Sequence, residues 1–104
     1  MKAVVVRYRV KADFVDENKR NIEQVLIEHR ERAHPGVRYT VHQDKDDAQN
    51  FVHVGMYADE AALDSTTALE SFKAFQAALR GSGPESKPSA TWLSTVGAGF
   101  DLFG

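Results

Sequence analysis

Hydrophobic and polar residues alternate along three stretches of the chain, which is the pattern of half-buried β-strands. These stretches are residues 3–11, 37–43 and 51–57, and each is rich in valine and aromatic side chains. A fourth strand is predicted at residues 90–96, where threonine and serine make the alternation less regular. The chain therefore supplies four short strands, enough for one small sheet.

Between the first two strands the apolar positions take the spacing of an amphipathic helix. One face of residues 13–33 carries Val15, Asn18, Ile22, Val25, Leu26, His29 and Ala33. Asp13 is predicted to cap the start of this helix, and Pro35 with Gly36 to end it. We expect the apolar stripe of the helix to lie against the sheet.

A second helical region follows the strand at 51–57. Asp59 is its predicted cap, and a first short helix is expected at residues 60–64. Residues 65–67 are Ser-Thr-Thr, which are poor in a helix interior, so we expect a kink or restart before the apolar stripe of residues 69–79. Residues 81–88 are predicted to form a loop, and residues 97–104 a tail whose two phenylalanines dock on the protein.

The order strand, helix, strand, strand, helix, strand is that of the ferredoxin-like βαββαβ fold, of the α+β class. Such a fold has one four-stranded antiparallel sheet with two helices on one face, and residues 1–104 form a single domain. Pairing Gln43 with Asn50 in the hairpin puts one set of side chains under the helices. These are Val4, Val6, Tyr8, Val10, Val37, Tyr39, Val41, Val52, Val54 and Met56.

The same register leaves the other face of the sheet uncovered. Four residues on that face are assigned to a dimer interface: Val5, Phe51, His53 and Tyr57. An exposed apolar face of this kind marks an interaction site, and a symmetric homodimer is the commonest way to bury one.

Composition narrows the classes of function. The 104 residues carry a net charge of -2, which argues against a general nucleic-acid binder, and no cysteine, which excludes thiolate chemistry and disulfides. The apolar run at residues 3–6 is too short for a signal peptide or a membrane span. A cytoplasmic location is the default expectation, with no membrane and no nucleic-acid partner.

Several segments, in this order and spacing, match a known family. They are Val10-Lys11 closing the first strand, Pro35-Gly36, Gln43-Asp44, Phe51 to Tyr57, Asp59-Glu60-Ala61-Ala62-Leu63 and Phe72-Lys73-Ala74-Phe75. Together they resemble the antibiotic biosynthesis monooxygenase (ABM) family along nearly the whole chain. The resemblance implies a homodimeric α+β barrel with a pocket in each subunit between sheet and helices. Fold alone does not fix a reaction.

The chain departs from parts of this family. The position that holds histidine in many members, and tryptophan in the haem-degrading members, is Thr66 here. The further histidine and asparagine of the haem degraders align with Gln76 and Val6. Haem degradation is therefore not expected.

The first helix supplies the candidate base. His29 lies on the apolar stripe, where it would face the pocket and take a phenolic proton near neutral pH. The alternative is a helix-end histidine bonded to a backbone carbonyl. Asn18 lies on the same stripe, either facing the pocket as a substrate-binding residue or capping the helix locally.

The remaining candidates are polar or aromatic side chains predicted to face the same space. The substrate-binding set is Tyr8, Asn18, Tyr39, Thr66, Gln76 and Trp92. For the tyrosines and Trp92 the alternative is plain core packing, and for Thr66 and Gln76 it is a helix kink and a solvent-exposed amide. His42 and His53 would be diagonal neighbours, but no third ligand accompanies them, so no metal is expected.

The leading hypothesis is a monooxygenase that needs neither metal nor flavin and acts on a small aromatic, phenolic or quinol-type substrate. The electrons would come from the substrate anion, and the protein would supply deprotonation, orientation and exclusion of water. The alternative is a non-catalytic dimeric module of the same fold that binds a small apolar molecule. RNA binding through aromatic side chains on the open sheet is a third, weaker alternative.

Overall fold

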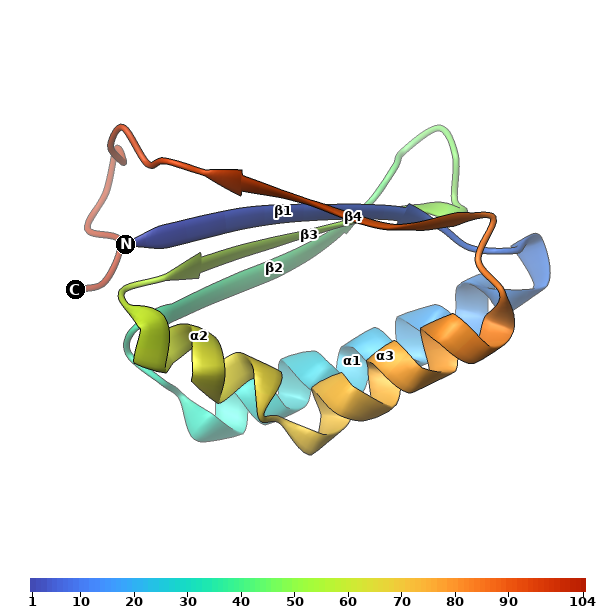
Figure 1. The fold of residues 1–104 in the computed structure, drawn as a ribbon, viewed down its shortest axis with the longest axis horizontal. Helices are drawn as coiled ribbons and strands as arrows, with labels where there is room; N and C mark the ends of the chain where they lie inside the picture. The colour runs from blue at the N-terminus through green and yellow to red at the C-terminus, as the bar shows by residue number, and fades with distance from the viewer.

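The computed structural model describes all 104 residues and contains the predicted order of strands and helices. The elements are β1 (Lys2–Arg9), α1 (Val15–Arg32), β2 (Val37–Gln43), β3 (Asn50–Tyr57), α2 (Glu60–Thr67), α3 (Glu70–Ser82) and β4 (Ser86–Leu93). The strands form one antiparallel sheet in the order β2-β3-β1-β4. Figure 1 shows the helices together on one side of this sheet, with both termini at one end of the molecule. The ferredoxin-like fold class is confirmed.

The ends of α1 differ in how well the sequence predicted them. A short 3-10 turn, Ala12–Phe14, precedes α1, and no side chain caps its start, so the predicted Asp13 cap is wrong. At the other end Ala33 takes a left-handed conformation (φ 48°), and its N–H donates to the carbonyl of His29. The helix thus ends before Pro35, as predicted.

The second helical region is two helices. The carboxylate of Asp59 accepts a hydrogen bond of 2.9 Å from the N–H of Ala62, which confirms the predicted cap of α2. The chain leaves α2 at Ala68 and re-enters a helix after Leu69, whose backbone is extended (ψ 131°). The predicted restart is therefore a complete break, and three helices cover the sheet.

The predicted register of the β2–β3 hairpin is wrong by one residue. Gln43 pairs with Phe51 and not with Asn50, and Val37 pairs with Tyr57. Because successive side chains of a strand point to opposite faces, a shift of one residue exchanges the two faces of β3. The turn at residues 44–49 sets this register, and its polar sequence carried no signal of which pairing closes it.

This exchange moves three of the predicted interface residues beneath the helices. Phe51, His53 and Tyr57 are only 2%, 5% and 2% exposed, so their assignment to the open face is wrong. The open face instead carries the half-buried β3 residues Val52, Val54 and Met56. Val5 pairs with Val54 on that face, so its predicted placement there is correct.

The hydrophobic core lies between the sheet and the helices α1 and α3. Its main cluster contains Tyr8, Val10, Phe14, Ile22, Val25, Phe51, Phe75 and Leu79. The rings of Tyr8 and Phe51 stack across β1 and β3 with centroids 5.7 Å apart. A smaller cluster of Val4, Tyr57 and Ala62 lies under α2. The core thus has two parts, a larger one beneath α1 and α3 and a smaller one beneath α2.

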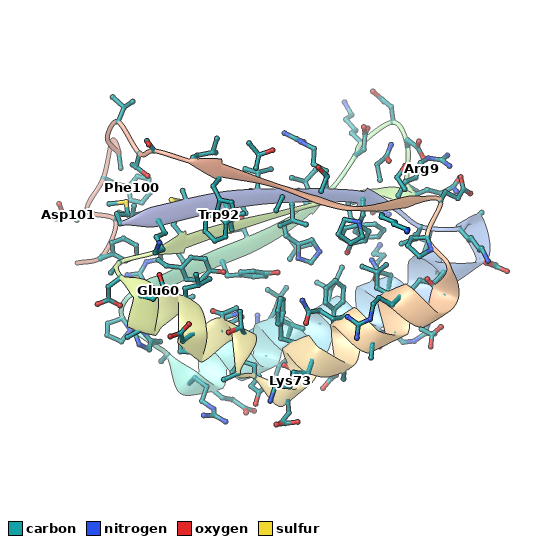
Figure 2. All side chains as sticks on the ribbon, in the orientation of Figure 1. Arg9, Glu60, Lys73, Trp92, Phe100 and Asp101 are labelled. Atoms are coloured by element: carbon teal, nitrogen blue, oxygen red, sulfur yellow. The ribbon has the colours of Figure 1, made fainter.

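The last strand begins earlier than predicted, at Ser86 rather than at residue 90. β4 pairs with β1, and the pairing ends where Leu93 lies opposite Ala3, before the predicted end at residue 96. All eight residues of this edge strand are exposed. Trp92 is 56% exposed (Figure 2).

The C-terminal tail docks only in part. Leu102 is buried, and the guanidinium of Arg38 lies 5.5 Å from the ring centroid of Phe103, a cation–π contact. Phe100 is 68% exposed (Figure 2), so only one of the two phenylalanines contacts the domain as expected. No helix of the structure is both long and apolar enough to cross a membrane.

Candidate active site

A cavity of about 620 Å³ lies between the sheet and α3. It is lined by Val6, Tyr8, Tyr39, His53, Phe72, Phe75, Gln76, Leu79, Arg80, Pro84, Lys87 and Pro88. The buried lining residues, such as His53 and Phe75, form its floor, while the exposed ones, Gln76, Arg80 and Lys87, mark its opening. The volume is in the range of small-molecule sites, and the wall is mainly apolar and aromatic.

A chain of hydrogen bonds crosses the floor of this cavity. Nε2 of His53 lies 2.7 Å from the hydroxyl oxygen of Tyr8, and Nδ1 lies 2.5 Å from the hydroxyl oxygen of Tyr39. The side-chain amide of Asn18 donates to the Tyr8 hydroxyl at 3.0 Å. Strands β1, β2 and β3 therefore each contribute one member, and α1 supplies the amide at its end.

The members of this chain stay uncharged at neutral pH. Burial lowers the pKa of His53 to about 4, because the imidazolium would lose its hydration there, and His42 adds a smaller lowering effect. Burial also raises the pKa of the Tyr8 and Tyr39 hydroxyls above their ordinary value. At neutral pH both tyrosine hydroxyls are therefore protonated, and the imidazole of His53 is neutral, with one N–H.

A neutral imidazole has one N–H donor and one bare nitrogen, so the chain has two arrangements. In one, Tyr8 donates to Nε2, Nδ1–H donates to Tyr39, and the Tyr39 proton is free. In the other, Tyr39 donates to Nδ1, Nε2–H donates to Tyr8, and the Tyr8 proton is free. Either arrangement leaves one hydroxyl able to donate to a ligand in the cavity.

His29, the predicted base, does not line this cavity. It borders a neighbouring hollow of about 430 Å³ together with Tyr39, which lines both spaces. The His29 and Tyr39 rings stack with centroids 4.9 Å apart, and Nε2 of His29 has no hydrogen-bond partner. Burial lowers the pKa of His29, against a smaller opposing effect of Glu28. Its role as a general base stays a prediction.

The other predicted substrate-binding residues divide into three groups. Tyr8, Tyr39 and Gln76 line the cavity. Asn18 is fully buried and reaches the cavity only through its bond to Tyr8. Thr66, buried in α2, and Trp92, on the exposed edge strand, are not among the lining residues.

Sequence reasoning missed His53, Arg80 and Lys87 as members of this site. The alternation of β3 does contain the signal for His53, since Phe51, His53 and Tyr57 share one face whichever way the strand is turned. If the face of β3 that holds these three residues is paired with the face of β1 that holds Val6 and Tyr8, all three lie beneath the helices. His42 lies opposite Val52, on the other face of the sheet from His53, and the structure holds no cluster of three or more potential metal ligands.

Comparison with known proteins places this geometry in a family. The sequence pattern described as antibiotic biosynthesis monooxygenase matches residues 1–78, three quarters of the chain. The chain belongs to the antibiotic biosynthesis monooxygenase family. No curated protein sequence matches it significantly.

Solved structures share the ABM fold at low sequence identity. A crystal structure of an antibiotic biosynthesis monooxygenase superposes with a TM-score of 0.79 at 20% identity, covering 93% of this chain and 100% of the other. A mutant of SnoaB, a cofactor-independent oxygenase from Streptomyces nogalater, gives 0.70 at 18% identity, covering 93% and 94%. Rv0793 from Mycobacterium tuberculosis gives 0.79 at 18% identity, covering 95% and 98%. These likenesses establish the fold.

Proposed function

We propose that this ABM protein is a cofactor-independent monooxygenase that oxidises a small hydroxylated aromatic molecule in the cavity. The observation that carries the proposal is the Tyr8–His53–Tyr39 chain on the floor of an apolar, aromatic-lined space. Membership of the ABM family supports it, and SnoaB, with the same fold, is described as a cofactor-independent oxygenase.

In the proposed reaction the substrate supplies all the electrons. A hydroxyarene anion transfers one electron to O2, and the two radicals join to form a carbon–oxygen bond and a peroxide. Protonation of the peroxide and loss of water then give a quinone, so one hydroxyarene and one O2 yield one quinone and one water. An apolar cavity favours these steps because it excludes bulk water from the anion and the peroxide.

The role of the His53 chain is to move protons. The substrate hydroxyl gives its proton to one tyrosine oxygen, and that tyrosine passes its own proton to the bare nitrogen of His53. The opposite N–H of His53 gives its proton to the second tyrosine oxygen, and the second tyrosine releases its hydroxyl proton to solvent. The imidazole changes tautomer and never becomes charged, which suits a group whose pKa lies near 4. Gln76, at the opening, is placed to hydrogen-bond a substrate carbonyl or hydroxyl.

The test is oxygen consumption by the protein with a panel of naphthols and hydroquinones after chelator treatment. His53→Gln should lower the rate by a factor of about 10² or more, because general acid–base groups contribute on that order. His29→Ala is the matched histidine control, and it should leave most of the rate if His53 carries the proton. Uptake no faster than in buffer with every compound would refute the oxygenase.

One observation favours a second candidate, a binding module that leaves its ligand unchanged. A pKa of about 4 makes His53 a weak base toward a phenol, which suits a hydrogen-bonding site as well as a catalytic one. Recovery of a bound naphthol intact after prolonged aerobic incubation, by wild type and His53→Gln alike, would select this candidate.

We also propose that the chain forms a homodimer through the open face of its sheet. Val5, Val52, Val54 and Met56 are the larger apolar residues of that face on β1 and β3, and no helix covers them. Dimerisation of ABM-like domains through the sheet is what the family resemblance implies, and an apolar sheet face of this kind supports it.

A further inference from the structure

Two cationic side chains stand at the opening of the cavity. Arg80, at the end of α3, and Lys87, at the start of β4, both line it and both are exposed. The other lining residues are uncharged at neutral pH, and no aspartate or glutamate is among them. The opening therefore carries positive charge with no counter-charge in the wall.

Neither Arg80 nor Lys87 makes a polar contact with the rest of the protein through its side chain. None of the six ion pairs of the structure includes Arg80 or Lys87, and neither side chain makes a hydrogen bond. Glu85 is the only acidic residue near them in the sequence, and it pairs with Arg9 and accepts a 2.9 Å hydrogen bond from Gln49. Glu85 does not line the cavity, and its carboxylate is paired with Arg9 at the end of β1 (Arg9 in Figure 2).

The backbone brings Lys87 to the cavity by an irregularity in the sheet. Ser86 lies opposite Arg9 and Ser89 opposite Arg7, so Lys87 and Pro88 together oppose the single residue Tyr8. Two residues against one is a β-bulge, which re-aims side chains. In a regular strand Lys87 and Pro88 would point to opposite faces, whereas here both line the cavity. Proline is tolerated at this position because a residue in a bulge of an edge strand does not need a backbone N–H to pair with the neighbouring strand.

We propose that the ligand of this cavity is an aromatic molecule that carries a carboxylate, with its rings on the apolar floor and the carboxylate between Arg80 and Lys87. A guanidinium can bind a carboxylate through two parallel hydrogen bonds, and an ammonium adds a second charge. This inference rests on the proposed function, since it names the class of substrate for the same cavity: a hydroxyarene carboxylate.

The experiment compares binding of 6-hydroxy-2-naphthoic acid, whose hydroxyl and carboxylate lie at opposite ends of the rings, with that of its methyl ester, by calorimetry under nitrogen so that no turnover occurs. Wild-type protein should bind the acid about tenfold more tightly, and this preference should shrink in 0.5 M salt. Arg80→Gln and Lys87→Gln should each weaken binding of the acid roughly two- to fivefold, as for exposed ion pairs, and leave the ester unchanged.

Lys73→Gln is the matched control, because Lys73 lies on the same helix, pairs with Glu70 and does not line the cavity. It should leave both affinities unchanged, although it alters the net charge equally. Equal affinity of wild type for acid and ester, or an equal loss in Lys73→Gln, would overturn the proposal. Because binding is measured without oxygen, a protein that prefers the acid but consumes no O2 would refute the oxygenase and keep this inference.

Discussion

His53 is the residue whose protonation the fold controls most strongly. Its ring lies between two tyrosine hydroxyls and near the rings of Tyr8 and Phe75, at centroid distances of 5.3 and 5.2 Å. Both nitrogens are hydrogen-bonded to hydroxyl groups. Protonation of the ring therefore requires the hydroxyl that donates to it to turn and accept instead, and it puts a charge where water cannot hydrate it. The neutral form of His53 is therefore part of the folded state.

This neutral histidine makes stability depend on pH. The folded pKa is about 4, whereas histidine in an unfolded chain has a pKa of about 6.5. Between these values the unfolded chain binds more protons, so the free energy of unfolding should fall as the pH is lowered from 6.5 toward 4. The full difference is roughly 3 kcal/mol, by the conversion of pKa shifts into free energy.

Urea unfolding at several pH values between 7.5 and 4.5 measures this loss. His53→Gln should be less stable at pH 7.5 but should lose much of the dependence on pH. A remaining slope is expected from His29, whose pKa is also lowered. Parallel slopes for wild type and His53→Gln would show that His53 is not the group responsible.

The sequence predicted a residue of the site correctly where that residue lies on the apolar stripe of a helix, or on a strand whose buried face is clear from the alternation. Tyr8, Tyr39 and Gln76 follow from such patterns and line the cavity. His53 was placed on the wrong face because its position depended on the length of a turn, and Lys87 could not be found because a bulge breaks the alternation of β4.

At the scale of the element, β3 contains a glycine, Gly55, against which the ring of Tyr57 from the same strand packs closely. Gly55 lies in the middle of the strand, on the face that the helices cover. A Cβ atom added there would lie 2.5 Å from the hydroxyl oxygen of Tyr57 and 2.8 Å from two of its ring carbons. The buried Tyr57 ring thus occupies the space that a side chain at Gly55 would need.

Gly55→Ala should therefore lower the free energy of unfolding by about 1–3 kcal/mol, because the buried ring must shift, as in other overpacked cores. Gly81→Ala is the matched control, since nothing lies within 4 Å of a Cβ at that position in α3. It should be neutral or raise stability by about 0.4–1 kcal/mol. Thermal and urea unfolding give both values, and equal effects of the two substitutions would contradict the close fit at Gly55.

Helix boundaries also belong to this scale, and the sequence predicted them unevenly. The Asp59 cap and the restart after residue 67 follow from side-chain chemistry that acts within a few residues. The start of α1 does not, because a 3-10 turn without a side-chain cap replaces the hydrogen bond that the Asp13 carboxylate was expected to accept. The sequence therefore predicted those helix boundaries that depend on contacts between residues close together in the chain.

For the molecule as a whole, the sheet separates two different surfaces. One is covered by α1, α2 and α3 and contains the cavity, while the other is open and carries valines and a methionine from the central strands (Figure 1). The order of elements was enough to predict this layered fold. The pairing of the hairpin then decided which residues belong to which surface, and that depends on contacts far apart in the chain.

The open surface gives a prediction about assembly. The wild-type protein should sediment as a dimer, and Val54→Glu should raise the dissociation constant by about a hundredfold or more, because a charge is buried twice across a symmetric interface. Ala77→Glu, on the exposed side of α3, is the matched control and should leave the dimer intact. Wild-type protein that sediments as a monomer at micromolar concentration would refute the proposed homodimer.

Strand β4 belongs to both surfaces at once. Lys87 and Pro88 wall the cavity, while Thr91, opposite Val5, extends the open face only three residues further along. A substrate in the cavity and a partner subunit on the open face would therefore contact the same short strand, from opposite sides of the sheet.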